Sequence, residues 1–467
     1  MLGLFRSKKN SSVLNNTQRI KGALVGFIVG DALGVPVEFK SREELTNKKV
    51  TKMLAYGTHS QPIGTWSDDS SMMLATIDSM VRNNMINYSD IMDCFLEWYS
   101  NGKYTPDGVV FDVGNATSLA LRKYKDDKNN YLCGSNDINS NGNGSLMRIL
   151  PISIYLHCTD EPVFDVIKNI SQMTHAHIYS VFSCLIYTVF IDEYLKELDI
   201  RKAYGNMQLN IKNVLENDND SILGDVDDLK SVFNRIVYED ISKLSEDKIK
   251  SSGYVVDTLE ACLWCVLNSK SYKDAVLLAV NLGNDTDTIG ALTGALAGLI
   301  YGYGCIPEKW INKLKKREYI ESLIKKYILF INNVSVKKEK ATAESWNCKD
   351  FKKSRKFECN ISLTKDEFKE LKYGHIPKEM EDHWFMYCDD KSINYYRSWN
   401  GIQVFKGYYK ETDSSVIIFE LEINDNPKEY KGSNDNESYQ VFYDLVVSEC
   451  NKIKWGCEYN EKYIFDT

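Results

Sequence analysis

The chain has 467 residues, of which 43% are hydrophobic and 26% charged, and its net charge is −8. This is the composition of a soluble globular protein that is long enough for two or three domains. The acidic balance argues against direct nucleic-acid binding, which needs a basic face, although a bound metal could supply local positive charge for a small anionic ligand.

The cysteines and the N-terminus both favour a cytoplasmic protein. The twelve cysteines are scattered, and the Cys262-x-x-Cys265 pair has neither a second pair nor a histidine at zinc spacing. Ordinary buried thiols in a reducing compartment are therefore the better interpretation. Residues 1–17 contain too short an apolar run for a signal peptide, and we interpret them as an N-terminal extension.

Residues 18–331 show helical periodicity and no alternating strand pattern. Apolar residues recur every three or four positions in three segments: Met73, Ile77, Met80 and Val81; Val255, Leu259, Cys262, Leu263 and Val266; and Ala275, Leu278, Ala279 and Leu282. This spacing predicts helices that bury one face. We therefore predict a compact all-α domain over this range.

One uncharged stretch, between Asp287 and Glu308, is as long as a bilayer-spanning helix. Its glycines recur at four-residue spacing, a pattern typical of closely packed helices: Gly290, Gly294, Gly298 and Gly302. However, the stretch is rich in glycine and alanine rather than leucine, and aspartates lie at its start. We predict the buried central helix of the domain and no membrane contact.

The composition changes at residues 332–345, which are lysine-rich and polar, as expected of a linker. Aromatic and β-branched runs follow, separated by turn residues: Trp384–Cys388, Ile393–Trp399, Ile402–Tyr409 and Val416–Ile423. Asn400-Gly401 is a strong hairpin signal, and residues 438–454 have helical spacing. We predict that residues 346–467 form a small α+β domain with an antiparallel meander.

The aromatic residues of this second domain allow two interpretations. They are Trp384, Phe385, Tyr387, Tyr395, Tyr396 and Trp399. They form either the core of a small sheet or a recognition surface. Under the second interpretation the domain contacts the substrate or a protein partner.

Two aspartate clusters, Ser67–Asp69 and Asp285–Thr288, carry the strongest chemical signal. Each cluster alone is explained by helix capping, because acids near a helix N-terminus are favoured by the helix dipole. Four aspartates gathered in one pocket, however, would repel one another without cations. Carboxylate and hydroxyl oxygens suit a hard cation such as Mg²⁺ or Mn²⁺. The pair of clusters therefore predicts a site for two such ions.

The chain resembles the ADP-ribosylglycohydrolase family, including the dinitrogenase-reductase-activating type, over residues of about 18–330. The matching blocks occur in the family's order: Gly22–Gly26 with Gly30–Phe39, Ser67–Asp69, Phe111–Asn115, Asn141–Arg148, Thr174-His175, Ser252–Glu260 and Asp285–Thr288. The resemblance implies a compact all-α fold with a cleft that holds two Mg²⁺ ions, or Mn²⁺ in their place.

The resemblance also implies roles for individual residues. The metal ligands that it implies are Ser67, Asp68, Asp69, Asp285, Asp287 and Thr288, with Asp68 and Asp287 also counted as catalytic. This chain has Ser67 where relatives usually have threonine, and Asn284 where many have glycine. Glu38 matches a glutamate near the metals, and Asp112 matches an aspartate beside the substrate guanidinium in the arginine-directed branch. The alternatives are a surface acid for Glu38 and a helix cap for Asp112.

Substrate contacts are implied around a glycine-rich segment, Asn141–Arg148, whose backbone N–H groups could cradle a diphosphate. The expected contacts are Asn143, Gly144, Ser145, His175 and Tyr254. His175 is otherwise a satisfied core histidine, and Tyr254 is either a wall for the adenine or a buried core tyrosine.

These residues lead to one main hypothesis and two alternatives. The main hypothesis is a binuclear metal hydrolase that removes ADP-ribose from a modified protein side chain or a small conjugate. The first alternative is a non-catalytic ADP-ribose or nucleotide-binding module that uses the same pocket. The second is a different metal-dependent hydrolase on the same fold.

Overall fold

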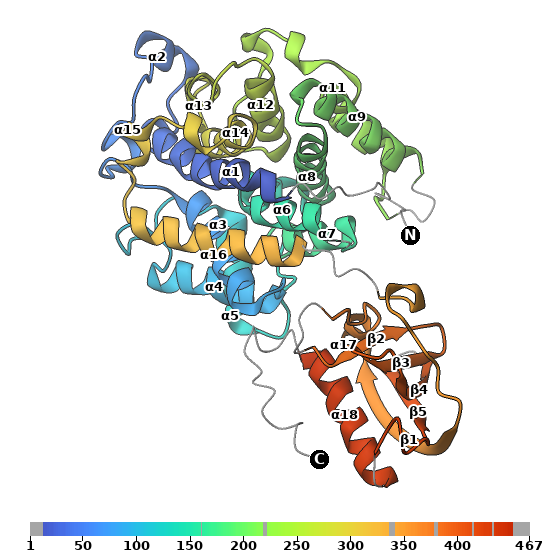
Figure 1. The fold of residues 1–467 in the computed structure, drawn as a ribbon. Helices are drawn as coiled ribbons and strands as arrows, with labels where there is room; N and C mark the ends of the chain where they lie inside the picture. Colours follow the sequence, from blue (N-terminus) through green and yellow to red (C-terminus); the bar gives the residue numbers. More distant parts are fainter. Residues whose placement is uncertain are drawn as a thin grey trace. The chain divides into compact units, whose positions relative to one another are not determined.

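The computed structural model describes residues 13–159, 161–217, 222–335, 341–377, 382–412, 415–431 and 434–451. The chain divides into two compact units, Met1–Ser335 and Val336–Thr467 (Figure 1). The first unit is helical and the second contains an antiparallel sheet. The predicted fold class of both parts is therefore confirmed.

Apart from isolated bridges, the described residues of the first unit form helices and loops. The α-helices are α1 Val13–Gly34, α2 Arg42–Asn47, α3 Asp68–Asn83, α4 Tyr88–Asn101, α5 Asn115–Asp126, α6 Leu150–Cys158, α7 Val163–Gln172, α8 Ile178–Glu197, α9 Ile200–Glu216, α10 Val226–Val232, α11 Asn234–Tyr238, α12 Val255–Leu267, α13 Tyr272–Val280, α14 Thr286–Tyr301, α15 Glu308–Ile311 and α16 Arg317–Ser335. Three short 3-10 turns bear on the site: η1 Val35–Val37, η2 Gly57–His59 and η4 Asn143–Arg148.

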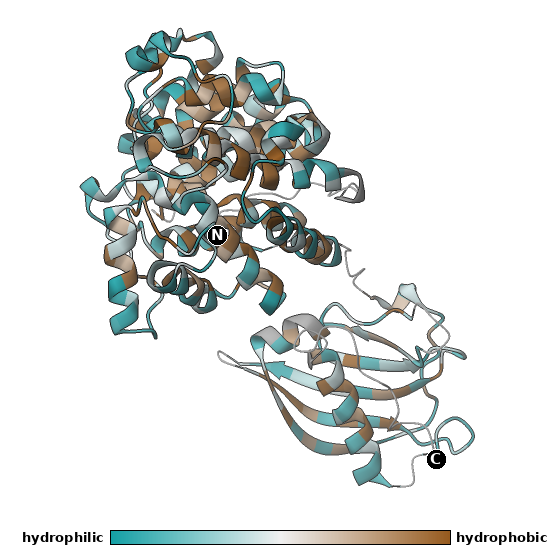
Figure 2. Cartoon of the chain, turned by 90° about the vertical axis from the view of Figure 1, so that its left-hand side faces the viewer, coloured by the Kyte–Doolittle hydropathy of each residue, from teal (hydrophilic) through white to brown (hydrophobic). Residues whose placement is uncertain are grey.

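Helices α1 and α14 cross antiparallel at the centre of this unit, with glycine facing glycine. Gly22, Gly26 and Gly30 of α1 lie against the backbone of Gly298, Gly294 and Gly290 of α14, respectively. A Cβ atom at any of the three α1 positions would overlap a carbonyl oxygen of α14. Hydrophobic residues gather on the central helices, while the outer faces of the unit are mostly hydrophilic (Figure 2). The glycine spacing thus allows the close crossing of two core helices.

The uncharged stretch that begins at Asp287 forms α14, whose residues are buried almost throughout. Two other segments, Asn16–Val37 and Ile178–Glu197, are long and apolar enough to cross a membrane by length and composition. Of their most apolar windows, 94% and 89% are buried inside the protein, as in core helices. Two such helices are weak evidence for a membrane span.

The unit boundaries differ in detail from those expected from composition. Helix α1 begins at Val13, inside the predicted N-terminal extension, and residues 1–12 lie outside the described part. Helix α16 continues through Ser335, into the stretch predicted as a linker, and residues 336–340 are again outside the described part. A helix can extend past its last apolar residue, so composition alone places such ends poorly.

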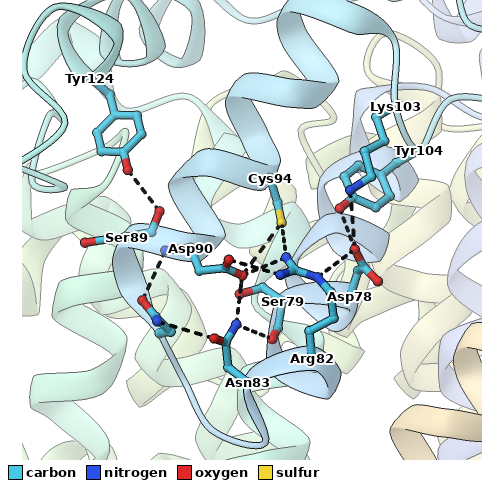
Figure 3. Close-up of polar contacts among 11 residues, drawn as sticks. Asp78, Ser79, Arg82, Asn83, Ser89, Asp90, Cys94, Lys103, Tyr104 and Tyr124 are labelled. Carbon is cyan, nitrogen blue, oxygen red and sulfur yellow. Dashed lines mark hydrogen bonds and ion pairs between the residues drawn. The ribbon is translucent and has the colours of Figure 1, made fainter.

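A polar network joins the C-terminal half of α3 to α4 (Figure 3). The Arg82 guanidinium donates to both carboxylate oxygens of Asp90, at 3.1 and 2.7 Å, and to the Cys94 sulfur at 2.9 Å. The Tyr104 hydroxyl donates to Asp78 at 2.7 Å. Because α3 carries the first aspartate cluster at its other end, this network fixes the helix that presents those aspartates.

Replacing Asp90 with alanine tests this network. The carboxylate also accepts from Ser79 Oγ at 2.6 Å and Asn83 Nδ2 at 2.8 Å, so its loss leaves several donors unpaired. We expect urea denaturation to show a loss of about 1–3 kcal/mol in the free energy of unfolding. The matched control is Asp93→Ala in the same helix, whose pair with Lys128 is largely exposed and which we expect to cost less than about 1 kcal/mol. Equal losses would contradict the role of the network.

The second unit is a five-stranded antiparallel sheet in the order β1-β5-β4-β3-β2. Its elements are β1 Ser354–Thr364, α17 Lys365–Leu371, β2 Trp384–Cys388, β3 Ser392–Arg397, β4 Gln403–Glu411, β5 Ser415–Asn424 and α18 Asp435–Asn451. The predicted meander corresponds to β2–β5, and Gly401 forms the β3–β4 turn with a left-handed φ of 71°. The prediction contained neither β1 nor α17.

Three of the six aromatic residues noted in the sequence of this unit belong to its core. Phe385, Tyr395 and Tyr396 are buried, and the ring of Phe442 from α18 lies close to Gly407 of β4. Trp399 differs from them, because 62% of its surface is exposed. The core interpretation therefore holds for the buried three, and Trp399 is left to solvent.

Candidate functional site

The two aspartate clusters lie at the N-termini of α3 and α14. Ser67 is the N-cap residue of α3, and its Oγ accepts the backbone N–H of Asp69 at 3.3 Å. Asp285 occupies the corresponding position of α14 without a side-chain capping bond. Helix capping therefore accounts for the Ser67 hydroxyl, but it does not account for the carboxylates of the aspartates.

One carboxylate from each cluster meets Asp31 at one buried point. Ligand atoms of Asp31, Asp69 and Asp287 all lie within 4.8 Å of one another, and Thr288 Oγ1 donates to Asp69 at 3.3 Å. Asp69 Oδ2, Asp285 Oδ1 and Asp287 Oδ2 are buried and have no hydrogen-bond partner among the residues that the structure describes. Buried oxygens are normally satisfied, so these three fit the coordination of a divalent cation.

Burial and mutual repulsion oppose ionisation in this cluster. Burial raises the pKa of Asp68, Asp69 and Asp287 well above the usual range, and neighbouring carboxylates raise it further. Burial also raises the pKa of Asp285, against a hydrogen bond from Asn143 Nδ2 at 2.8 Å. Positive charge at this point would restore the ionised form.

Asp31 is a member of the cluster that the sequence argument missed. Its carboxylate accepts the backbone N–H of Ser67 at 2.9 Å, and the backbone N–H and hydroxyl of Ser70 at 3.0 and 2.5 Å. Burial raises the pKa of Asp31 to about 6, although these hydrogen bonds oppose the shift. Because its oxygens already have donors, Asp31 anchors the start of α3. The feature of the sequence that points to Asp31 is a single carboxylate within the apolar part of α1.

The buried acids predict a pH dependence for the cation-free protein. Their pKa values are raised on folding, to about 8 for Glu38, whereas unfolded Asp and Glu titrate near about 4. The folded state therefore holds more protons in this window, and stability falls as pH rises through it. We expect scanning fluorimetry to show a Tm gain from Mg²⁺ or Mn²⁺ that grows between about pH 5 and pH 8. A Tm gain that is constant with pH would contradict the raised pKa values of these buried acids.

A cavity of about 470 Å³ opens beside the acidic cluster. Its acidic lining comes from Glu38, Asp68, Asp69, Asp112 and Asp285, together with Thr288. A second part of the lining comes from the glycine-rich segment, His175 and helix α5: Gly142, Asn143, Gly144, His175, Asn115, Thr117 and Lys123. The α5 residues had no predicted role, because the Phe111–Asn115 block was used only for Asp112.

The acids at the cavity edge do not fit their alternative interpretations. Glu38 is only 4% exposed, so it is not a surface acid. Asp112 has a left-handed φ of 54° and does not cap α5, whose N-cap residue is Gly114. Glu38 Oε2 contacts His59 Nε2, and one ligand atom from each of Glu38, His59 and Asp112 lies within 4.8 Å of the others.

The expected substrate contacts fall into different positions. Gly144 and His175 line the cavity, and a Cβ at Gly144 would lie 2.7 Å from the His175 ring. His175 bonds Thr174 through Nδ1 at 2.7 Å, and burial with the nearby Arg148 charge lowers its pKa to about 3. His175 is therefore a neutral imidazole facing the cavity.

Of the other expected contacts, Asn143 hydrogen-bonds to Asp285, and Ser145 and Tyr254 lie outside the cavity lining. Asn143 lines the cavity, but its amide donates to Asp285 and to Thr258 Oγ1. Ser145 is buried beneath the wall, where its hydroxyl accepts from the Cys184 thiol. Tyr254 is 36% exposed and precedes α12. Neither Ser145 nor Tyr254 belongs to the lining of the cavity.

Known proteins share this helical unit. A model of the ADP-ribosylglycohydrolase family matches residues 13–338. An ADP-ribosylarginine hydrolase, Tri1, of Serratia proteamaculans is 33% identical over 65% of this chain and 77% of its own length. The ADP-ribosyl-[dinitrogen reductase] glycohydrolase of Rhodospirillum rubrum is 27% identical over 63% of this chain and 90% of its own length.

A solved structure gives the same result. A chain of an "ADP-ribosylglycohydrolase-related protein complex" aligns with a TM-score of 0.55 and 29% sequence identity. The alignment covers all of that chain and 69% of this one. This share is close to the share of the chain taken by the helical unit, Met1–Ser335.

Proposed function

The chain belongs to the ADP-ribosylglycohydrolase family, and we propose that it is a divalent-metal-dependent hydrolase that removes ADP-ribose from a modified side chain or small conjugate. One observation carries the proposal. Three buried aspartates, Asp69, Asp285 and Asp287, each have an oxygen that no described residue hydrogen-bonds, beside a cavity large enough for a nucleotide-sized ligand. We further propose that the enzyme acts in the cytoplasm.

Different residues line the two sides of the cavity, and each side has its own role in the proposed reaction. Ser67, Asp68, Asp69, Asp285, Asp287 and Thr288 would hold two Mg²⁺ or Mn²⁺ ions, which when bound supply positive charge for ribose hydroxyls and a water. Gly144 and neutral His175 provide a wall without negative charge, which suits the diphosphate. Burial raises the pKa of Glu38 to about 8, so its carboxyl can hold or move a proton near the scissile bond.

The acceptor that fits the cavity edge best is arginine. Asp112 and Glu38 offer carboxylates there, and the neighbouring Phe39 ring is 66% exposed. A guanidinium pairs with carboxylates and stacks on aromatic faces, which a serine hydroxyl cannot do. Relatives from Serratia proteamaculans and Pseudomonas putida that carry the name ADP-ribosylarginine hydrolase support the same choice.

A hydrolysis panel tests the function. Peptides ADP-ribosylated on arginine or on serine are incubated with the full chain in Mg²⁺ or in EDTA, and free ADP-ribose is measured by chromatography, with Asp68→Ala as the inactive control. We expect Mg²⁺-dependent release from the arginine peptide. ADP-ribose binding without release from any linkage would support the non-catalytic module. Activity confined to substrates without ADP-ribose would support a different metal-dependent hydrolase.

A further inference from the structure

The Glu38 carboxylate depends on a single neighbour. Glu38 lines the cavity although the residue is only 4% exposed. Its Oε2 is bonded to His59 Nε2, and no other group within the described ranges hydrogen-bonds to the carboxylate. A carboxylate held by one side chain loses its orientation when that side chain is removed.

His59 contacts Glu38 but does not line the cavity. It is absent from the cavity lining, and its side chain is 15% exposed. Its ring lies 5.9 Å from the Phe39 ring and 5.2 Å from the Phe111 ring, centroid to centroid. Packing against both rings restricts the imidazole to the direction that meets Glu38.

The backbone around Glu38 is clamped, so its side chain is the part free to move. Thr58, from the same turn as His59, donates its hydroxyl to the Glu38 carbonyl at 2.7 Å. The N–H of Phe39 donates to the Asn284 carbonyl, and the N–H of Asn284 donates to the Lys40 carbonyl, both at 2.7 Å. These bonds tie the Glu38 segment to the residue that precedes Asp285.

A nearby carboxylate repels the ionised form of Glu38. Asp112 contributes a carboxylate oxygen within 4.8 Å of both the Glu38 oxygen and the His59 nitrogen. When both groups are ionised, their like charges at this separation disfavour each other, and a glutamate side chain has several rotatable bonds through which it can turn away. The His59 donor opposes this movement.

We propose that His59 is a positioning residue for ADP-ribosyl hydrolysis, which holds the Glu38 carboxylate toward the cavity beside the aspartate cluster. The inference rests on the proposed function, because it assigns His59 a part in that same reaction. Misplacing a reacting group by about 1 Å can cost roughly 100-fold in rate. A residue that acts only through Glu38 should matter only while Glu38 is present.

A double-mutant cycle tests this directly on the full chain. Initial rates of ADP-ribose release from ADP-ribosyl-arginine peptide are measured for His59→Ala, Glu38→Gln and the double variant. We expect His59→Ala to lower kcat about 10–100-fold with KM changed less than about 3-fold. The double variant should match Glu38→Gln within about 2-fold. His59→Gln, which keeps an N–H donor, should recover at least about 5-fold over His59→Ala.

A matched control separates positioning from folding. His157 and Asp192 form another buried histidine–carboxylate pair, at 2.8 Å between α6 and α8 and outside the cavity lining. His157→Ala should leave kcat within about 2-fold. The Tm gain produced by Mn²⁺ should be kept in His59→Ala, since its metal ligands are intact.

Three results would overturn the inference. One is full additivity of the His59 and Glu38 substitutions. Another is a change confined to KM, and the third is a His59→Gln variant no better than His59→Ala. If the wild-type chain releases no ADP-ribose from any linkage, the proposed function fails and the inference fails with it. Release by the wild type with an additive cycle removes the inference alone.

Discussion

Asparagine in place of Asp287 is expected to lower the kcat for ADP-ribose release by at least about 1000-fold. Asp287 is 1% exposed, and its Oδ2 has no hydrogen-bond partner in the described part of the chain. The amide keeps the size of the side chain but removes the charge that a divalent cation requires. Isothermal titration with Mn²⁺ should show the matching loss of affinity.

Stability measurements distinguish this loss from unfolding. Burial and the neighbouring carboxylates raise the pKa of Asp287, so its charge destabilises the cation-free protein at neutral pH. Asp287→Asn should therefore equal or exceed the wild-type Tm in EDTA, while losing most of the Tm gain from Mn²⁺. Asp274→Asn, an exposed acid in the first turn of α13, is the control and should change neither quantity. A large fall in Tm in EDTA would refute this account of Asp287.

Four acids that lie at the buried point or line the cavity are recognisable in the sequence, because charge is conspicuous in apolar helical surroundings. Asp68, Asp69, Asp285 and Asp287 stood out as pairs at the start of apolar runs. Asp31 did not, since a single aspartate inside a helix has no local pattern that separates an anchor from a chance polar residue. Only the packing of α1 against the start of α3 shows its three hydrogen bonds.

Side-chain direction limited the prediction of the substrate wall. Asn143, Gly144 and Ser145 are neighbours in one motif, yet η4 turns Ser145 away from the cavity and toward Cys184. The His59–Glu38 pair was equally invisible, because twenty-one positions separate the two residues. Such pairs depend on how turns pack, which the spacing of residue types does not encode.

In the fold, periodicity identified the helices and the meander but missed β1. Ser354–Thr364 alternates exposed and half-buried positions over most of its length, because it is an edge strand with charged side chains. Edge strands of this kind lack the apolar alternation that marks central strands. Helix α17 is too short, at seven residues, to show a clear period.

The close crossing of α1 and α14 predicts a large effect on stability from a single methyl group. In Gly30→Ala, the new Cβ would overlap the Gly290 carbonyl oxygen and crowd the backbone N of Ala291, which it would meet at 3.0 Å. Backbone atoms cannot turn aside as a flexible side chain does. We expect a loss at the upper end of the roughly 1–3 kcal/mol typical of overpacking, measured by urea denaturation.

The same substitution should weaken the metal site, because α1 carries Asp31 and α14 carries Asp287, one position after Gly30 and three before Gly290. Forcing the helices apart separates the anchor of α3 from the second cluster, so the Tm gain from Mn²⁺ should fall as well. Gly205→Ala in α9 is the matched control: a Cβ there meets nothing within 4 Å, and the change should stabilise by up to about 1 kcal/mol. If Gly30→Ala and Gly205→Ala shift stability in the same direction, the backbone contact between α1 and α14 does not limit the fold.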